Sequence, residues 1–179
     1  MKRSLLLCLI GGLSVGASPA LAQHSQTRQG FWFNVGLGYG SLGCQGCSGR
    51  TGGLSGGLSL GGTLTPKLLL GVGTTGWRKS ENGATLTVGT LDARVRYYPS
   101  ATGGFFLTGG LGLGSIGANA SGFGSASETG VGLMLGLGVD LRIGNSLSVT
   151  PFWNGFAINT SNSDANVGQI GIGLTTHTH

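Results

Sequence analysis

Large apolar residues alternate with Gly, Ser, Thr or charged residues along much of this chain. In segment 131–143 every odd position is a large aliphatic residue, and every even position except Met134 is Gly or charged. A period of two is that of a β-strand with two unlike faces. The same alternation predicts eight strands, at about residues 31–40, 52–64, 67–77, 85–98, 104–114, 131–143, 146–156 and 167–176.

Nearly every predicted strand has an apolar face, and no predicted helix is available to cover it. A closed barrel in a membrane resolves this problem, because aliphatic side chains then face lipid and small or polar ones face the lumen. The fold class we predict is therefore all-β, an eight-stranded antiparallel up-and-down transmembrane β-barrel. Pro151 falls in the middle of a strand, where it lacks a backbone donor, and it predicts a bulge.

The predicted connections alternate in length, as they do in outer-membrane barrels, where periplasmic turns are short and external loops are long. Both termini are then periplasmic. The short turns lie at 65–66, 99–103 and 144–146, and the longer loops at 41–51, 78–84, 115–128 and 157–165.

The N-terminus has the pattern of a secretion signal. Lys2 and Arg3 precede a short apolar stretch, and an A-x-A site ends at Ala22. We predict a signal peptide over 1–22, an N-terminal arm over 23–30 and the barrel over 31–179, located in the cell outer membrane.

Composition supports a lipid-facing surface. Charged residues make up 8% of the chain, against about 25% in a typical soluble domain. The net charge of +5 does not indicate nucleic-acid binding, because the basic residues after the signal are scattered and form no patch. Most glycines in the strand segments fall at the alternate positions that are predicted to face the lumen.

Six charged residues occupy strand positions that are predicted to face the lumen, in its periplasmic half: Lys67, Asp92, Arg94, Arg96, Asp140 and Arg142. Charges inside a narrow barrel must be paired or hydrated, so we expect an ion-pair cluster that closes the lumen. The alternative is a polar conduction path. Aromatic residues near the predicted strand ends suggest interfacial girdles: Phe31, Trp32, Phe33, Trp77, Tyr97, Tyr98, Phe105, Phe106 and Phe156.

Two further motifs lie in the predicted external loops. Cys44 and Cys47 favour a structural disulfide, because the cell exterior is oxidising. A redox pair lacks a helix N-terminus here, and a metal site lacks further ligands; both stay as weaker alternatives. Arg50, Arg78 and Lys79 are candidates for contact with lipopolysaccharide phosphates, or are simply solvated.

Catalysis and cofactor binding find little support. Each G-x-G-x-x-G match follows from alternating glycine and opens no helix, so no nucleotide site is expected. Histidines occur only at 24, 177 and 179, outside the predicted strands or at their end, which leaves no base for a Ser-His-acid set. We predict no enzyme activity, no catalytic or metal site and no cofactor.

Several segments carry a family resemblance. Arg94–Pro99, Gly104–Leu107, Gly110–Gly114 and Gln169–Leu174 resemble the small outer-membrane β-barrel domain family, similar in architecture to the OmpA/OmpX-type barrels. The resemblance covers about residues 29–179. It implies a fold without catalytic residues, with outer-membrane lipid and the barrel-insertion machinery as partners. Such chains commonly end in an aromatic residue, whereas this sequence ends Thr176-His177-Thr178-His179.

The resulting prediction is a non-enzymatic outer-membrane β-barrel with a structural or surface-interaction role in the cell envelope. The alternative is a narrow pore or transporter for small molecules, since many lumen positions are glycine. Four larger residues on the lumen face would fill part of that space: Trp32, Phe106, Met134 and Phe152.

Overall fold

The computed structural model describes residues 28–44, 49–120 and 124–178. The predicted signal peptide, most of the N-terminal arm and Cys47 lie outside these residues. The strands are β1 Phe31–Cys44, β2 Thr51–Thr65, β3 Leu68–Glu81, β4 Ala84–Tyr97, β5 Phe105–Ala120, β6 Gly124–Val139, β7 Leu141–Arg142, β8 Leu147–Asn159 and β9 Asp164–His177.

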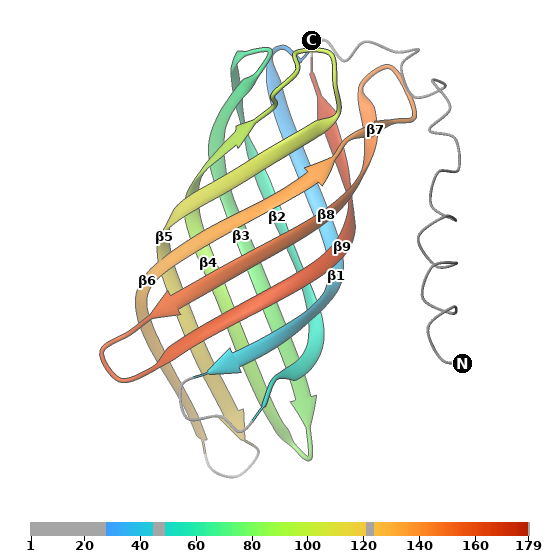
Figure 1. Cartoon of the computed structure of the whole chain (residues 1–179). Helices are drawn as coiled ribbons and strands as arrows, with labels where there is room; N and C mark the ends of the chain where they lie inside the picture. The colour runs from blue at the N-terminus through green and yellow to red at the C-terminus, as the bar shows by residue number, and fades with distance from the viewer. Residues whose placement is uncertain (1–27, 45–48, 121–123, 179) are drawn as a thin grey trace, which may run out of the picture.

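The strands form a closed antiparallel barrel (Figure 1). From β1 to β6 and from β7 to β9 each strand pairs with its neighbours in sequence, and β1 closes the sheet against β9 from Trp32↔His177 to Cys44↔Ala165. β6 and β7 both pair with β8, so they are two parts of one barrel strand. The predicted eight-stranded barrel is confirmed.

The predicted bulge at Pro151 is wrong. Gly138 lies opposite Phe152 and Leu141 lies opposite Val149, so both strands advance by the same number of residues across the gap. Proline has no N–H to donate to a ladder, and the pairing with β8 is interrupted there without a change of register. This interruption is what separates β6 from β7.

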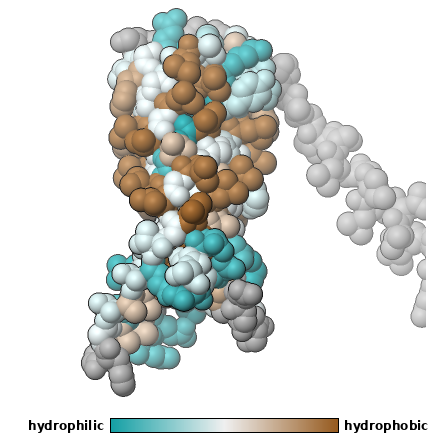
Figure 2. All heavy atoms as spheres, turned by 90° about the vertical axis from the view of Figure 1, so that its left-hand side faces the viewer, coloured by the Kyte–Doolittle hydropathy of each residue, from teal (hydrophilic) through white to brown (hydrophobic). Residues whose placement is uncertain are grey.

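Large apolar side chains cover the outer wall. Leu37, Leu91, Leu111, Leu135 and Ile172 are each more than half exposed. Figure 2 shows, on one face of the molecule, a broad apolar band that gives way to polar residues toward one end of the barrel. No helix among the described residues is long and apolar enough to cross a membrane.

The two ends of the barrel differ. The short-turn end, uppermost in Figure 1, carries the turns before β3, β5 and β8 together with Arg28 and Thr178. The opposite, hairpin end carries strands that run well beyond the apolar band. The predicted long loops are therefore wrong in large part, because their Gly, Ser and Thr residues continue the backbone ladders.

A tight turn joins β3 to β4 at the hairpin end. Asn82 and Gly83 have positive φ angles of 51° and 75°, as a two-residue type I′ turn requires. Glu81↔Ala84 closes this hairpin, so the predicted loop 78–84 is reduced to two residues.

The predicted aromatic girdles are only half right. Phe31, Phe33, Tyr97 and Phe105 are exposed on the outer wall. The other five aromatic side chains of the predicted girdles point inward and are buried, because their parity is that of the lumen: Trp32, Trp77, Tyr98, Phe106 and Phe156.

Candidate functional site: the filled lumen and the external cup

A buried ion pair occupies the lumen beside β4. Arg94 Nε and an Arg94 terminal nitrogen each donate to Asp92 at 2.8 Å. The same terminal nitrogen donates to Thr75 Oγ1 at 2.9 Å, and Thr90 Oγ1 donates to Asp92 at 3.2 Å. Because both carboxylate oxygens and the guanidinium are engaged, the pair meets the condition under which buried charges are tolerated.

Glycines on the adjacent strands make room for this pair. A Cβ added at Gly73 of β3 would overlap the guanidinium of Arg94, and one added at Gly110 of β5 would overlap the carboxylate of Asp92. The lumen glycines here are thus complementary to large polar side chains on β4.

A second polar network lies nearer the short-turn end. Tyr98 Oη and Thr150 Oγ1 each donate to Asp140 at 2.7 Å. Arg96 donates to Tyr98 Oη at 3.4 Å, and its guanidinium carbon lies 4.1 Å from the Phe106 ring centroid. Trp32, Leu69, Tyr98 and Phe106 form a buried cluster at this level.

Arg28, from the N-terminal arm, closes the short-turn end. Its guanidinium carbon lies 3.4 Å from the Tyr98 ring centroid. It donates to the carbonyl oxygens of Pro66 at 3.3 Å and Ala101 at 3.2 Å, and also to that of Gly103. Burial lowers the pKa of the Arg28 guanidinium from its ordinary value, although an arginine stays charged in proteins.

The six predicted lumen charges are not all brought together. Asp92, Arg94, Arg96 and Asp140 are buried in the lumen. Lys67 lies in the turn before β3 and is exposed, since the strand starts one residue later than predicted. Arg142 is half-buried and donates to the carbonyls of Gly144, at 2.9 Å, and Asn145 in the next turn.

An apolar layer fills the lumen toward the hairpin end. Leu42, Trp77, Met134, Phe156 and Ile158 are its largest buried members, and Trp77 Nε1 donates to the Gly40 carbonyl at 3.0 Å. On its short-turn side, the neighbouring polar layer surrounds a cavity of about 20 Å³, lined in part by Arg94 and Met134. Such a cavity has room for about one water molecule.

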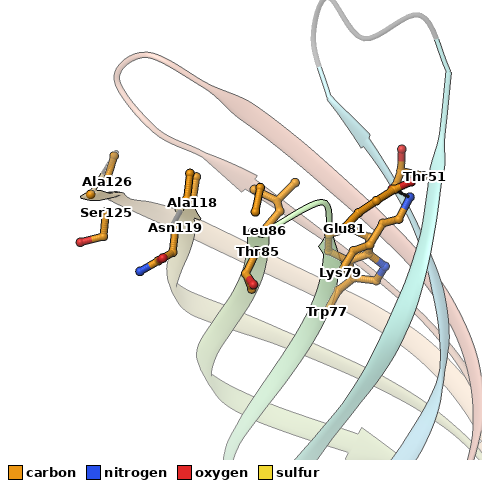
Figure 3. A pocket seen from close by; sticks show the side chains of 13 residues that line it. Thr51, Trp77, Lys79, Glu81, Thr85, Leu86, Ala118, Asn119, Ser125 and Ala126 are labelled. Carbon is orange, nitrogen blue, oxygen red and sulfur yellow. Dashed lines mark ion pairs between the residues drawn. The ribbon is translucent and has the colours of Figure 1, made fainter. Parts of the chain in front are cut away.

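A cup with a volume of about 500 Å³ opens at the hairpin end, on the outer side of the apolar layer. It lies on the inner face of the strand extensions, with Trp77 at its base (Figure 3). Leu86, Ala118 and Ala126 contribute apolar wall. Lys79 Nζ lies 2.6 Å from Glu81 Oε2, so the cup also carries an ion pair.

The predicted lipopolysaccharide contacts have three different environments. Arg50 Nε donates to Ser41 Oγ at 3.1 Å, and an Arg50 terminal nitrogen donates to Asn166 Oδ1 at 2.7 Å, which ties β1 to β9. Lys79 points into the cup. Arg78 lies on the outer wall of β3 and is exposed. Cys44 ends β1, and its predicted disulfide to Cys47 stays a prediction, since Cys47 lies outside the described residues.

The sequence matches the family described as outer membrane protein beta-barrel domain over residues 5–177. The chain belongs to this family. This outer membrane β-barrel protein is accordingly located in the outer membrane. Arg28 and Thr178 lie at the short-turn end, so the prediction that both termini are periplasmic would make the hairpin end and its cup external.

Solved structures share the fold of this outer membrane β-barrel at low sequence identity. Neisserial surface protein A is 15% identical with a TM-score of 0.68, over 86% of this chain and 100% of its own. Ail, the attachment invasion locus protein of Yersinia pestis, is 12% identical with a TM-score of 0.60, over 82% and 99%. The N-terminal β-barrel domain of Pseudomonas aeruginosa OprF is 15% identical with a TM-score of 0.51, over 83% and 98%. No curated protein matches the sequence.

Proposed function

We propose that this protein is a non-conducting, non-enzymatic outer-membrane barrel that acts through its external end. One observation carries the proposal: side chains fill the lumen in successive layers, whereas a cup of about 500 Å³ opens outward above them. An eight-stranded barrel is just wide enough for side chains to fill.

The layers argue against the narrow pore. An ion entering from the periplasm would meet Arg28 first, then the Trp32–Phe106 cluster and the Asp92–Arg94 pair. Beyond these lies the apolar layer of Trp77 and Met134. Opening a path would require breaking buried contacts in each layer, which is costly in a close-packed interior.

The cup suits an apolar group of an external partner. Ail has been crystallised with the heparin analogue sucrose octasulfate, a polyanion. In this chain Lys79 is paired with Glu81, and the rest of the wall combines Trp77, Leu86 and four alanines with the uncharged Thr51, Thr85, Asn119 and Ser125. We therefore propose an aliphatic or aromatic side chain of a surface partner as the occupant, with the ion pair at its edge.

Conductance tests the closed lumen. The mature protein reconstituted in planar bilayers is expected to give no unitary current steps. The Arg28→Ala variant should also give no current steps, because the buried layers behind Arg28 remain. Reproducible steps from the wild-type barrel would refute the proposal in favour of the pore.

Tryptophan fluorescence tests the cup. In a Trp32→Phe/Trp153→Phe background, Trp77 is the remaining tryptophan, and trichloroethanol serves as a small apolar quencher. We expect saturable quenching that Ala118→Phe reduces by filling the cup. The control Ser127→Phe lies on the outer face of β6 and should leave the quenching unchanged; equal effects of both variants would argue against the cup.

A further inference from the structure

Arg78 differs from the other external cations in having no partner. Among the described residues its side chain makes no hydrogen bond or ion pair, whereas the side chains of Arg50 and Lys79 both do. It is exposed, and its position in β3 puts it on the same outer face as Leu70 and Val72. Its guanidinium is therefore available to an anion outside the barrel wall.

A groove of about 510 Å³ lies on this outer wall, across β3, β4, β5 and β6. Leu91 and Leu113 line it on the side of the apolar band, and Thr87, Ser115 and Thr129 line it on the external side. In Figure 2 the molecule narrows between the apolar band and its polar end. The lining thus changes along the barrel axis from leucines to hydroxyl-bearing residues, as an outer leaflet changes from acyl chains to headgroups.

Gly76 and Gly117 help to create the hollow without being required by the packing beneath, whereas a Cβ at Gly89 would lie 3.1 Å from the Thr75 carbonyl oxygen. Gly76 and Gly89 face each other across β3 and β4. A Cβ added at Gly76 would have its nearest neighbour at 3.9 Å, and one at Gly117 at 4.0 Å, which are ordinary contact distances. The lumen glycines near Asp92 and Arg94 are different, since side chains fill the space beside them.

Arg78 stands at the edge of this groove. It is the register partner of Thr87, a lining residue. Directly opposed residues on one face of an antiparallel pair have Cβ atoms about 4.5–5.5 Å apart. A guanidinium at this position can reach a headgroup whose acyl chain lies in the groove.

We propose that the groove and Arg78 form a binding site for a phosphorylated glycolipid of the outer leaflet. One acyl chain lies against Leu91 and Leu113 over the glycine floor. The hydroxyls of Thr87 and Ser115 meet the sugar–acyl junction, and Arg78 donates to a phosphate, a charge-assisted contact that arginine makes well. Glycolipid rather than glycerophospholipid is favoured because the site is at the external end and its polar edge is made of hydroxyls.

The site is separate from the proposed function. The groove lies on the outer face of the strands whose inner faces form the cup. Loss of lipid binding would leave conductance and Trp77 quenching unchanged, so the two proposals can fail independently.

Native mass spectrometry of the mature protein with added lipids tests the site. The probes are bisphosphorylated lipid A, its dephosphorylated form and phosphatidylglycerol. Arg78→Gln should weaken binding of bisphosphorylated lipid A by about three- to tenfold and leave the dephosphorylated form unchanged. Lys67→Gln, which removes an exposed charge at the periplasmic end, is the matched control and should change neither.

A second pair of variants tests the groove itself. Gly76→Leu should weaken binding of both forms of lipid A by filling the hollow. Gly62→Leu is the control, since a Cβ there meets nothing within 4 Å and the position lies on the outer wall of β2. A heat-dependent gel shift establishes that each variant is folded.

Three results would overturn the proposal. The first is an equal effect of Arg78→Gln and Lys67→Gln, which would mean a general charge effect. The second is an equal effect of Gly76→Leu and Gly62→Leu. The third is binding of phosphatidylglycerol as tight as that of bisphosphorylated lipid A, which would make the site one for any anionic lipid.

Discussion

Replacing Arg94 by methionine should strongly destabilise the barrel without opening it. Arg94→Met keeps an apolar stem of similar length but removes three hydrogen bonds, two to Asp92 and one to Thr75. The Asp92 carboxylate then stays in the lumen with Thr90 as its remaining donor among those contacts. Side chains of the intact pair are only 6% and 0% exposed, so bulk water does not hydrate the Asp92 carboxylate, and the adjoining cavity has room for only about one water molecule.

The expected magnitude follows from this burial. Removing one partner of a buried ion pair typically costs about 3–5 kcal/mol, because an uncompensated charge is left behind. Removing both charges, in Asp92→Leu/Arg94→Met, avoids that cost. We expect the double variant to be more stable than Arg94→Met alone, with a coupling energy of about 1–3 kcal/mol.

Reversible urea unfolding in lipid vesicles, followed by tryptophan fluorescence, measures these free energies. Conductance in planar bilayers should remain absent in both variants. The reasoning is refuted if Arg94→Met loses less than about 1 kcal/mol, the scale of an exposed ion pair. A double variant less stable than Arg94→Met would refute it too, and ion current through Arg94→Met would show that the pair is a gate.

Two further substitutions test complementarity inside the lumen. Gly110→Ala places a methyl group on the Asp92 carboxylate and should lower the free energy of unfolding by about 1–3 kcal/mol through overpacking. The control Gly109→Ala faces outward, where the added Cβ has its nearest neighbour at 3.4 Å, and should cost little. Equal unfolding midpoints of the two variants would contradict this. Trp77→Phe leaves the Gly40 carbonyl without its 3.0 Å donor and should cost about 1–3 kcal/mol. Its control is Trp153→Phe on the lipid face, and a melting temperature lowered equally by both would remove the special role of the lumen tryptophan.

The two faces of each strand could be predicted because the period of two directly encodes them. Leu91, Val95 and their neighbours point outward, and Asp92 and Arg94 point inward, as the parity requires. The match of one family profile to nearly the whole chain agrees with this pattern. Parity would also have placed Trp77 and Tyr98 in the lumen, had it been given more weight than their position near predicted strand ends.

Other features could not be read from periodicity. Strand ends beyond the membrane contain Gly, Ser and Thr with few aliphatics, yet their backbones pair as well as those in the bilayer, so the strands were predicted too short. Arg28 lies in an arm without any repeating pattern. Its burial depends on carbonyl groups from two turns distant in sequence, which no local signal reveals.

Closure of the barrel joins opposite ends of the polypeptide. The Phe31 N–H donates to Thr178 Oγ1 across a sequence separation of 147 residues, and the β1–β9 ladder lies beside it. Contacts of such long range form late and slowly. During export the chain must therefore cross the periplasm as an open sheet or unfolded coil, with its lipid-facing leucines exposed and prone to aggregate. The exposed leucines need protection from aggregation until the last strand pairs, and a chain truncated before β9 would leave β1 with an unpaired edge.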